Sequence, residues 1–313
     1  MPRSAADVSG AAAEEPGASL DVGVAGPPLP PGRIVDLPGR GRTFVREAAG
    51  PPGAPTLILL HGWTVTADLN WFTSYEPLSE HFRVLALDHR GHGQGIRSWK
   101  PFRLEDCADD AAALVEALSI DQVIPVGYSM GGPVAQLMWR RHRDLVAGLV
   151  LCATGRSFSG MDLGSRIYFS SFLGLSVAAR LTPAPVRREV SSRVIRRRLG
   201  VGPWAEWGLS EMQRNDTSTI LQAGWTIGQF RSHDWIGEVD VPTAVVVTAH
   251  DRVVHPSRQL RLAEAIPEAE VVTVEGDHGS CVTDPDLFVP GLIEACKGVA
   301  TRAGLPDPPV AST

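Results

Sequence analysis

The sequence predicts an α/β fold in which helices flank a mostly parallel β-sheet and a helical insertion interrupts the core. Short, continuous apolar runs alternate with segments of helical periodicity along most of the chain. This alternation is typical of a parallel sheet, whose strands are buried on both faces by the helices that connect them. It breaks off between residues 155 and 235 and then resumes, which indicates one α/β core with an inserted helical segment.

The first part of the core contains four expected buried strands and two expected helices. A hairpin over residues 33–37 and 42–47 precedes them, because the intervening residues PGRG are typical of a turn. The expected strands span residues 56–60, 83–87, 122–126 and 147–153, and the expected helices span residues 104–118 and 130–142.

The second part of the core has strands over residues 243–248 and 270–274 and helices over residues 256–265 and 286–297. We therefore assign residues 33–154 and 236–303 to the core and residues 155–235 to a helical cap or lid. The insertion follows a strand, at the sheet edge where open α/β folds bind ligands, so it is placed to cover the site. Residues 1–32 are expected to be a disordered tail and residues 304–313 a flexible one.

The composition is that of an ordinary globular protein. Of 313 residues, 43% are hydrophobic and 20% are charged, and the net charge of −6 argues against a protein that coats nucleic acid. Four widely spaced cysteines form no zinc-type cluster, which favours reduced thiols in a cytoplasmic protein without a metal. No apolar run reaches the roughly 18 residues of a membrane-spanning helix, and residues 1–32 lack the apolar centre of a signal peptide.

A glycine-rich turn, GYSMGG at residues 127–132, follows an expected buried strand and opens an expected helix. In this setting the pattern G-x-S-x-G holds the serine in a strained backbone that projects its hydroxyl from the turn. Gly127 and Gly131 are needed because side chains there would strike the neighbouring strand and helix. The helix that follows adds its amino-terminal dipole near the developing negative charge. Ser129 is therefore the predicted catalytic nucleophile.

His278 is the predicted general base. It lies in the loop EGDHGS at residues 275–280, just after the last expected strand, and can reach across the end of the sheet to accept the serine proton. We expect His89 and His92 to form a structural turn that braces the nucleophile loop, and His61 to order the first core loop. The remaining histidines considered, at positions 81, 142, 233 and 255, fit the surface or helix ends.

A histidine that acts as a base needs a carboxylate to set its tautomer. Asp251 follows the strand expected at residues 243–248, on the same sheet edge as the serine and histidine. Asp277 adjoins His278 and is poorly placed to hold its ring, whereas Asp240 precedes its strand and lies at the wrong end of the sheet. Asp251 is therefore the predicted acid. The chain order Ser, Asp, His is the order expected of the fold that carries this turn.

Two backbone N–H groups are needed to stabilise the oxyanion of a tetrahedral intermediate. The residue after the nucleophile, Met130, supplies one of them. The loop HGWT at residues 61–64, after the first long strand, supplies the other through the amide of Trp63. Gly62 allows that backbone to approach the serine closely.

Together these motifs resemble the α/β-hydrolase superfamily. The matching pieces are HGW at 61–63, DHRGHG at 88–93, GYSMGG at 127–132, Asp251 and GDHG at 276–279, within about residues 33–303. The resemblance implies that Ser129, Asp251 and His278 form the triad and that Trp63 and Met130 form the oxyanion hole. Some members carry the acid after the strand that corresponds to residues 147–153, but the sequence TGR at 154–156 offers no carboxylate.

The resemblance is nearest to the esterase and lipase branch, because dehalogenases and epoxide hydrolases of this fold use an aspartate nucleophile. We expect hydrolysis of a carboxylic ester or lipid substrate with a small-to-medium acyl group, with no cofactor. The same triad also serves C–C bond hydrolases, enol-lactonases and cofactor-free perhydrolases, which the motifs do not separate. A binding module on this scaffold is a further alternative, although no catalytic part is missing.

The insertion is basic. Eleven arginines, no lysine and six acidic residues lie between residues 155 and 235, in a chain whose net charge is negative. The arginines are densest at residues 187–198, where they alternate with apolar side chains. This pattern predicts contact with anionic lipid or with an acidic substrate group, and a solvated helix face is the alternative. Trp204, Trp207 and Trp225 are candidates for an acyl pocket or for plain core.

Overall fold

The structure is a computed structural model that describes residues 25–159, 163–183, 185–186, 189–190, 193 and 204–306. The strands are β1 (Gly32–Leu37), β2 (Gly41–Ala48), β3 (Thr56–Leu60), β4 (Arg83–Leu87), β5 (Ile124–Tyr128), β6 (Leu149–Cys152), β7 (Thr243–Thr248) and β8 (Glu270–Val274). The helices are α1 (Ala67–Trp71), α2 (Tyr75–Ser79), α3 (Leu104–Ala117), α4 (Gly131–Arg141), α5 (Leu163–Leu181), α7 (Ala205–Gln213), α8 (Thr217–Gln229), α9 (Pro256–Ala263), α10 (Ser280–Thr283) and α11 (Pro285–Arg302), with 3-10 turns at Arg143–Leu145 and Ile236–Glu238.

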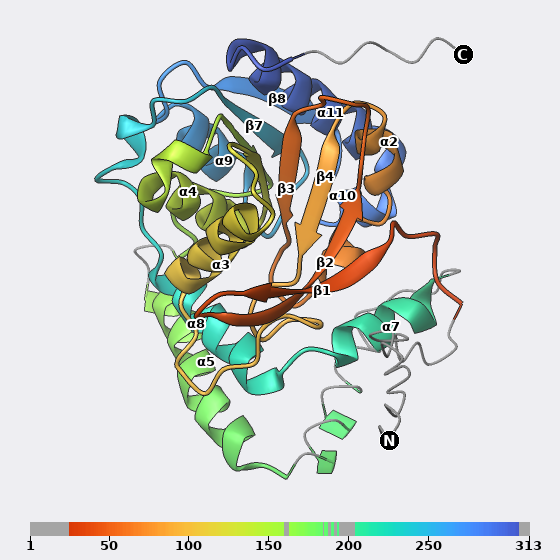
Figure 1. Cartoon of the computed structure of the whole chain (residues 1–313). Helices are drawn as coiled ribbons and strands as arrows, with labels where there is room; N and C mark the ends of the chain where they lie inside the picture. Colours follow the sequence, from red (N-terminus) through yellow and green to blue (C-terminus); the bar gives the residue numbers. More distant parts are fainter. Residues whose placement is uncertain are drawn as a thin grey trace, which may run out of the picture.

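The eight strands form one sheet in the order β1-β2-β4-β3-β5-β6-β7-β8 (Figure 1). β1 pairs antiparallel with β2 and β2 with β4, whereas every pairing from β4 to β8 is parallel. Because the strands after β2 run in one direction, the loops at their carboxyl ends meet at one edge of the sheet. The predicted mostly parallel sheet with flanking helices is confirmed.

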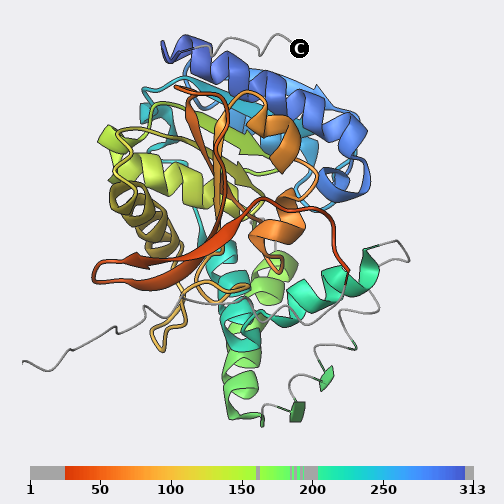
Figure 2. The same ribbon diagram turned by 45° about the vertical axis from the view of Figure 1, so that its right-hand side comes forward.

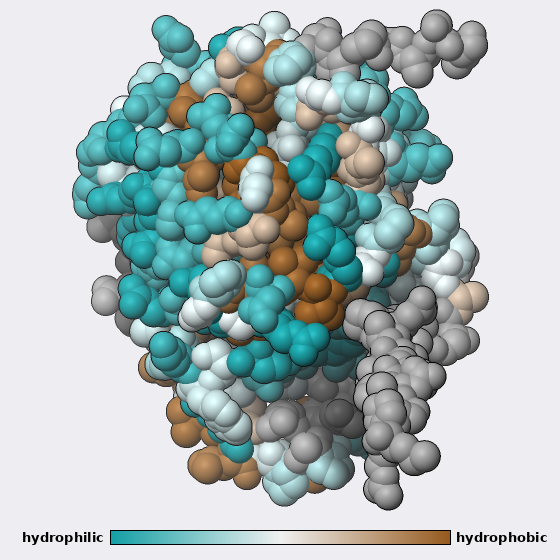
Figure 3. Space-filling view, in the orientation of Figure 1, coloured by the Kyte–Doolittle hydropathy of each residue, from teal (hydrophilic) through white to brown (hydrophobic). Residues whose placement is uncertain are grey.

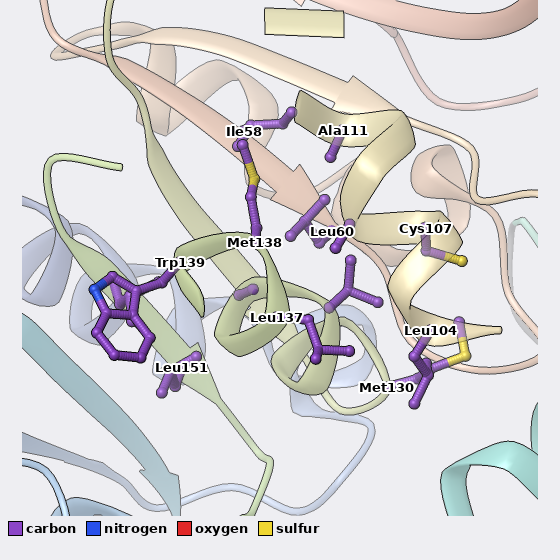
Figure 4. Close-up of a cluster of buried hydrophobic side chains, with 14 of the residues drawn as sticks. Ile58, Leu60, Leu104, Cys107, Ala111, Met130, Leu137, Met138, Trp139 and Leu151 are labelled. Carbon is purple, nitrogen blue, oxygen red and sulfur yellow. The ribbon is translucent and has the colours of Figure 1, made fainter. Parts of the chain in front are cut away.

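Strand β3 shows why the core strands have continuous apolar sequences. Successive side chains of a strand point to opposite faces, so Ile58 and Leu60 pack into the hydrophobic cluster on one face and Leu57 and Leu59 into the cluster on the other. All four side chains are fully buried. Figure 4 shows the first cluster, in which side chains of α3 and α4 meet Ile58, Leu60 and Leu151 of the sheet.

Helices cover both faces of the sheet (Figure 2). Helices α3, α4 and α9 bury their apolar sides in the first cluster, and α1, α2 and α11 bury theirs in the second. This arrangement gives the strands the two covered faces that their sequences require.

The segment between β6 and β7 carries α5, α7 and α8, and Figure 1 shows these helices together at one end of the sheet. Helices α5 and α8 pack closely, because Gly228 of α8 leaves room for the ring of Phe169. The outer side of α5 is apolar and exposed, with Ile167, Val177 and Leu181 open to solvent, and hydrophobic surface gathers over this helix in Figure 3. Most of the arginine-rich stretch lies outside the described residues, but Arg193 is exposed and forms an ion pair with Glu189.

The structure differs from the sequence prediction in several places. Residues 25–31, expected to belong to the amino-terminal tail, contact the fold: the carbonyl of Pro30 accepts a hydrogen bond from Arg46, and Leu29 packs against the second cluster. Strand β5 ends at Tyr128, two residues later than predicted, because its ladder with β6 continues to the residue before the turn. The short helices α1, α2 and α10 were not predicted, since four or five residues show no helical periodicity. Residues 1–24 and 307–313 of the predicted tails lie outside the described residues.

All four cysteines are buried and free of disulfide bonds. Within the described ranges, no helix combines the length and apolar character needed to cross a membrane.

Candidate active site

Ser129 lies in the tight turn between β5 and α4, with a φ of 52°. A positive φ is uncommon for a residue with a side chain and must be held in place by its surroundings. The N–H of Ser129 donates to the carbonyl of Cys152 at 3.0 Å, and its own carbonyl accepts from the N–H of Gly132 at 3.0 Å. The Thr154 hydroxyl donates to the same carbonyl at 2.8 Å. These bonds fix the strained turn.

The glycines around Ser129 are required by close packing. A Cβ at Gly127 would strike the carbonyl oxygen of Gly131, and a Cβ at Gly131 would strike that of Leu60 on the neighbouring strand β3. The turn therefore has the crowding that its sequence predicts.

The structure brings the three predicted side chains together at the carboxyl edge of the sheet. Ser129 follows β5, Asp251 follows β7 and His278 follows β8. His278 Nε2 lies 3.0 Å from Ser129 Oγ, and His278 Nδ1 lies 2.7 Å from Asp251 Oδ2. The Asp251 side chain is fully buried, whereas that of His278 is 22% exposed, so the carboxylate is shielded from solvent and the imidazole is not.

Asp251 is held firmly in its loop. One carboxylate oxygen accepts the N–H groups of Val253 and Val254 at 2.7 and 2.8 Å. The other accepts the Thr248 hydroxyl at 2.9 Å and also faces His278. Because a carboxylate only accepts, His278 donates from Nδ1, and its Nε2 lone pair points to the Ser129 hydroxyl.

The two aspartates rejected from the sequence have other partners. Asp277 accepts the N–H of Gly279 at 2.7 Å, and Asp240 accepts the indole N–H of Trp139 at 2.9 Å. Neither carboxylate holds the His278 ring. Of the three aspartates considered, Asp251 is the one whose carboxylate lies within hydrogen-bond distance of the His278 ring.

Trp63 and Met130, the predicted oxyanion donors, lie on the two loops beside Ser129. Met130 is the residue at the amino-terminal end of α4, and Trp63 follows Gly62 in the loop after β3. A Cβ at Gly62 would lie 3.5 Å from Ser129 Cβ, so the loop runs directly past the nucleophile. In the part of the chain that the structure describes, neither the Trp63 nor the Met130 amide donates to a protein acceptor. Both N–H groups are therefore available to a ligand.

Three residues that support the site were not found from the sequence. The Tyr128 hydroxyl donates to the carbonyl of His278 at 2.7 Å and ties the nucleophile strand to the histidine loop. The Asn70 side chain accepts the N–H of Gly62 at 2.8 Å and anchors the loop that carries Trp63. Thr154 supports the Ser129 carbonyl, as described above. Tyr128 occupies the variable position of the G-x-S-x-G pattern, and the other two have no motif that marks them.

Three buried histidines lie beneath the site and serve its architecture. His61 Nδ1 lies 2.8 Å from the carbonyl of Gly62, and its Nε2 accepts the N–H of His89 at 2.9 Å, which joins two core loops. Burial lowers the pKa of His89 to about 3 and that of His92 to about 4, and it lowers the pKa of His61 well below its ordinary value. All three rings are therefore neutral at pH 7.

Asp88 joins the same loops. Its carboxylate accepts the N–H of Ala67 at 2.8 Å and that of Gln94 at 2.7 Å. Burial raises its pKa to about 7 despite these bonds. Among the residues that the structure describes, no three His, Cys, Asp or Glu side chains are grouped as a metal site would require.

A family model described as the alpha/beta hydrolase fold matches residues 55–285. A protein of Agrobacterium fabrum provisionally named carbamate hydrolase RutD is 28% identical over 251 residues, which cover 77% of this chain and 92% of that protein. The bifunctional esterase/perhydrolase DCH of Acinetobacter calcoaceticus is 40% identical over 104 residues, 33% of this chain and 37% of that protein. The solved structure of the enol-lactonase from Burkholderia xenovorans LB400 has a TM-score of 0.68 at 22% identity, over 85% of this chain and 100% of that chain, which shows a shared fold.

Proposed function

Because the chain belongs to the α/β-hydrolase family, we propose that it is a serine hydrolase that cleaves a carboxylic ester through an acyl-enzyme on Ser129. The observation that carries this proposal is the continuous set of hydrogen bonds from Asp251 through His278 to Ser129, at 2.7 and 3.0 Å. A nucleophile, a base and an orienting acid in hydrogen-bond reach of one another are the parts that acyl transfer needs.

In the first half of the reaction, the Ser129 oxygen attacks the ester carbonyl while His278 Nε2 takes its proton. Asp251 holds the ring and stabilises the imidazolium that forms. The N–H groups of Met130 and Trp63 donate to the oxyanion of the tetrahedral intermediate. The intermediate collapses when His278 returns the proton to the departing alcohol, which leaves the acyl group on Ser129.

In the second half, water replaces the alcohol. His278 takes a proton from the water as it attacks the acyl-enzyme, and the oxyanion again forms beside Met130 and Trp63. Collapse of this second intermediate releases the carboxylic acid and returns the proton to Ser129. The cycle uses only side chains and backbone amides of this chain.

A second candidate keeps the same site and changes the bond that is cleaved. One relative is named an esterase/perhydrolase and one fold neighbour an enol-lactonase, and both names describe acyl chemistry. Enol-lactone hydrolysis, perhydrolysis or C–C bond hydrolysis would use the same attack by Ser129 and the same oxyanion donors. Product analysis over ester, thioester, enol-lactone and ring-cleavage substrates separates these reactions.

Peripheral contact of the helical insertion with anionic lipid is a further part of the proposal. Its support is the arginine-rich sequence at residues 187–198 and the exposed apolar side of α5, where Leu181 is 82% exposed. Sedimentation with anionic and neutral vesicles tests the contact, with the variant R196E/R197E/R198E as the charge control. Equal binding to both kinds of vesicle, or binding to neither, would exclude contact with anionic lipid.

The decisive experiment is a panel of activated esters of graded acyl length. The wild-type protein should hydrolyse them, and its labelling by a fluorophosphonate should be lost in Ser129→Ala together with turnover. Ser257→Ala is the matched control, because Ser257 is exposed and its hydroxyl forms hydrogen bonds with His255 and Arg261, away from Ser129. Labelling of the Ser129→Ala protein at the wild-type rate would overturn the assignment of the nucleophile.

A further inference from the structure

The helical insertion holds the loop that carries the Trp63 amide at three successive points. The Trp63 indole N–H donates to the carbonyl of Ile220 at 2.8 Å. The Thr64 carbonyl accepts from the side-chain amide of Asn215 at 2.8 Å, and the Thr66 hydroxyl donates to Glu211 at 3.0 Å. The oxyanion loop thus takes its shape from residues about 150 positions away along the chain.

We propose that Asn215 is a positioning residue for the oxyanion hole. This inference rests on the proposed function, because it concerns the amide of Trp63 as an oxyanion donor. Asn215 touches no reacting atom in this assignment. It acts by setting the backbone of the loop that presents the amide.

Asn215 bridges two loops of the core with both ends of its amide. Its Nδ2 donates to the carbonyl of Thr64, and its Oδ1 accepts the N–H of Gly93 at 2.7 Å. The next residue, Asp216, donates its backbone N–H to the carbonyl of Gly91 at 2.8 Å. Because the amide donates to one loop and accepts from the other, it has a single orientation. The Asn215 side chain therefore fixes the distance between the two loops.

The backbone that Asn215 holds is strained. Thr64 has a φ of 71°, in the left-handed region that a β-branched residue rarely adopts. Relaxation of this residue would rotate the peptide that joins it to Trp63 and would turn the Trp63 backbone. The bond from Asn215 to the Thr64 carbonyl opposes that rotation.

Trp63 is therefore held between two asparagine side chains. On the side before it, Asn70 of the core accepts the N–H of Gly62 at 2.8 Å, and on the side after it, Asn215 of the insertion holds Thr64. The Trp63 ring is packed as tightly, since a Cβ at Gly224 of α8 would come within 2.6 Å of it. The Phe172 ring of α5 contacts it edge-on, with centroids 5.2 Å apart. The insertion thus completes one half of the oxyanion hole.

The test compares Asn215→Ala and Asn215→Asp with a control on helix α8, which follows Asn215 in the chain. Asn215→Asp keeps the size of the side chain and the oxygen that accepts the N–H of Gly93, but it loses the N–H group that donates to the carbonyl of Thr64. It therefore tests the proposal even if Asn215→Ala does not fold. Loss of an oxyanion donor typically costs about 10²–10³ in kcat, and a misplaced donor should cost part of this, about 10-fold or more. The value of KM and the pKa seen in the pH–rate profile should stay unchanged, because His278 and Asp251 are not touched.

Thr226→Val is the matched control. Thr226 lies on α8 and donates to the carbonyls of Gln222 and Phe102, so its loss weakens the contact of the insertion with the core without touching the oxyanion loop. It should leave kcat within about 2-fold of the wild type.

Thr64→Gly supplies a rescue. Glycine adopts a positive φ without strain, so the double variant Asn215→Ala/Thr64→Gly should have a kcat about 3-fold or more above that of Asn215→Ala.

A second readout does not depend on activity. Hydrogen exchange of the Trp63 indole N–H, followed by NMR and assigned with Trp63→Phe, should be faster in Asn215→Ala than in Thr226→Val. If Ser129→Ala retains turnover, the proposed function fails, and this exchange rate still tests how Asn215 holds the loop. Wild-type kcat in both Asn215 variants, an equal loss of kcat in Thr226→Val, or a loss that appears only in KM would overturn the inference.

Discussion

Thr154 donates a hydrogen bond of 2.8 Å from its hydroxyl to the carbonyl oxygen of Ser129. Thr154 lies just after β6, at the position where some α/β-hydrolases carry the catalytic acid. In this chain the residue at that position bonds the Ser129 backbone, and the carboxylate that faces His278 comes from the loop after β7. The Thr154 side chain also packs over Gly132, where a Cβ would collide with it.

Thr154→Val should weaken the nucleophile turn while it preserves the shape of the side chain. The carbonyl of Ser129 would keep only the N–H of Gly132, and the loss of one buried hydrogen bond costs about 1 kcal/mol of unfolding free energy. We expect kcat to fall several-fold, because the strained Ser129 backbone can relax. Thr154→Ser keeps the hydroxyl and should retain kcat. Equal kcat in the valine and serine variants would show that the bond does not matter, and urea unfolding with ester kinetics measures both effects.

Asp251→Asn should lower kcat/KM by about 10³–10⁴-fold, as expected when the tautomer of a triad histidine is wrong. The N–H groups of Val253 and Val254 require an acceptor, so the asparagine oxygen would face them and its NH₂ group would face His278. His278 Nδ1 would then accept, and Nε2 would carry a proton toward Ser129. The measurement is steady-state ester hydrolysis.

Asp277→Asn is the control for this substitution. Asp277 adjoins His278 but bonds the N–H of Gly279, and an asparagine oxygen makes the same bond. We expect a change in kcat/KM of less than about 3-fold. A larger loss in Asp277→Asn than in Asp251→Asn would reverse the choice of acid.

Gly131→Ala and Gly174→Ala should have opposite effects on stability. A Cβ at Gly131 would collide with the carbonyl of Leu60, so the variant should unfold at markedly lower temperature or fail to fold. Gly174 lies inside α5 with open space around the added methyl, and alanine there should raise the unfolding free energy by up to about 1 kcal/mol. Thermal unfolding measures both, and a neutral Gly131→Ala protein would contradict the packing of the turn.

The buried histidines should lower the unfolding free energy of the protein as the pH falls below 6. Their pKa values are depressed from the ordinary 6.5, to about 3 for His89 and about 4 for His92, so their contribution is present above pH 6.5 and is lost as pH falls. Asp88 acts in the opposite sense: burial raises its pKa from 3.8 to about 7, so it stabilises the fold at low pH. Of the groups with these pKa values, the unfolded chain near pH 5 binds a proton on each of the two histidines, and the folded chain binds one on Asp88. This net difference of about one proton predicts a loss of about 1 kcal/mol of unfolding free energy between pH 6 and 5.

His92→Asn measures the contribution of one of these histidines to the pH dependence of the unfolding free energy. Asparagine does not titrate, so the fall in unfolding free energy between pH 6 and 5 should be smaller by about 1 kcal/mol than in the wild type. Urea unfolding at several pH values gives the comparison, and groups common to both proteins cancel. An unchanged slope would mean that His92 is not neutral in the folded state.

Several features of the fold and the candidate site could be predicted because they are local in the chain. The apolar runs of the core strands predict burial on both faces, and GYSMGG at residues 127–132 predicts the turn by the crowding of its glycines. Asp251 and His278 follow from their places after strands of one parallel sheet. The short helices α1, α2 and α10 could not be predicted, since their side chains are fixed by contacts with distant segments.

By itself, the sequence determined the parallel sheet, the nucleophile turn and the order Ser, Asp, His, because strand periodicity and glycine sterics act between near neighbours. Only the tertiary structure decided that Thr154 supports Ser129, that Tyr128 holds the His278 loop and that Asn215 of the insertion holds the oxyanion loop. The physical reason is that a hydrogen bond depends on distance and direction between atoms. Residues 64 and 215 meet only when the chain has folded, and no pattern in either segment records the other.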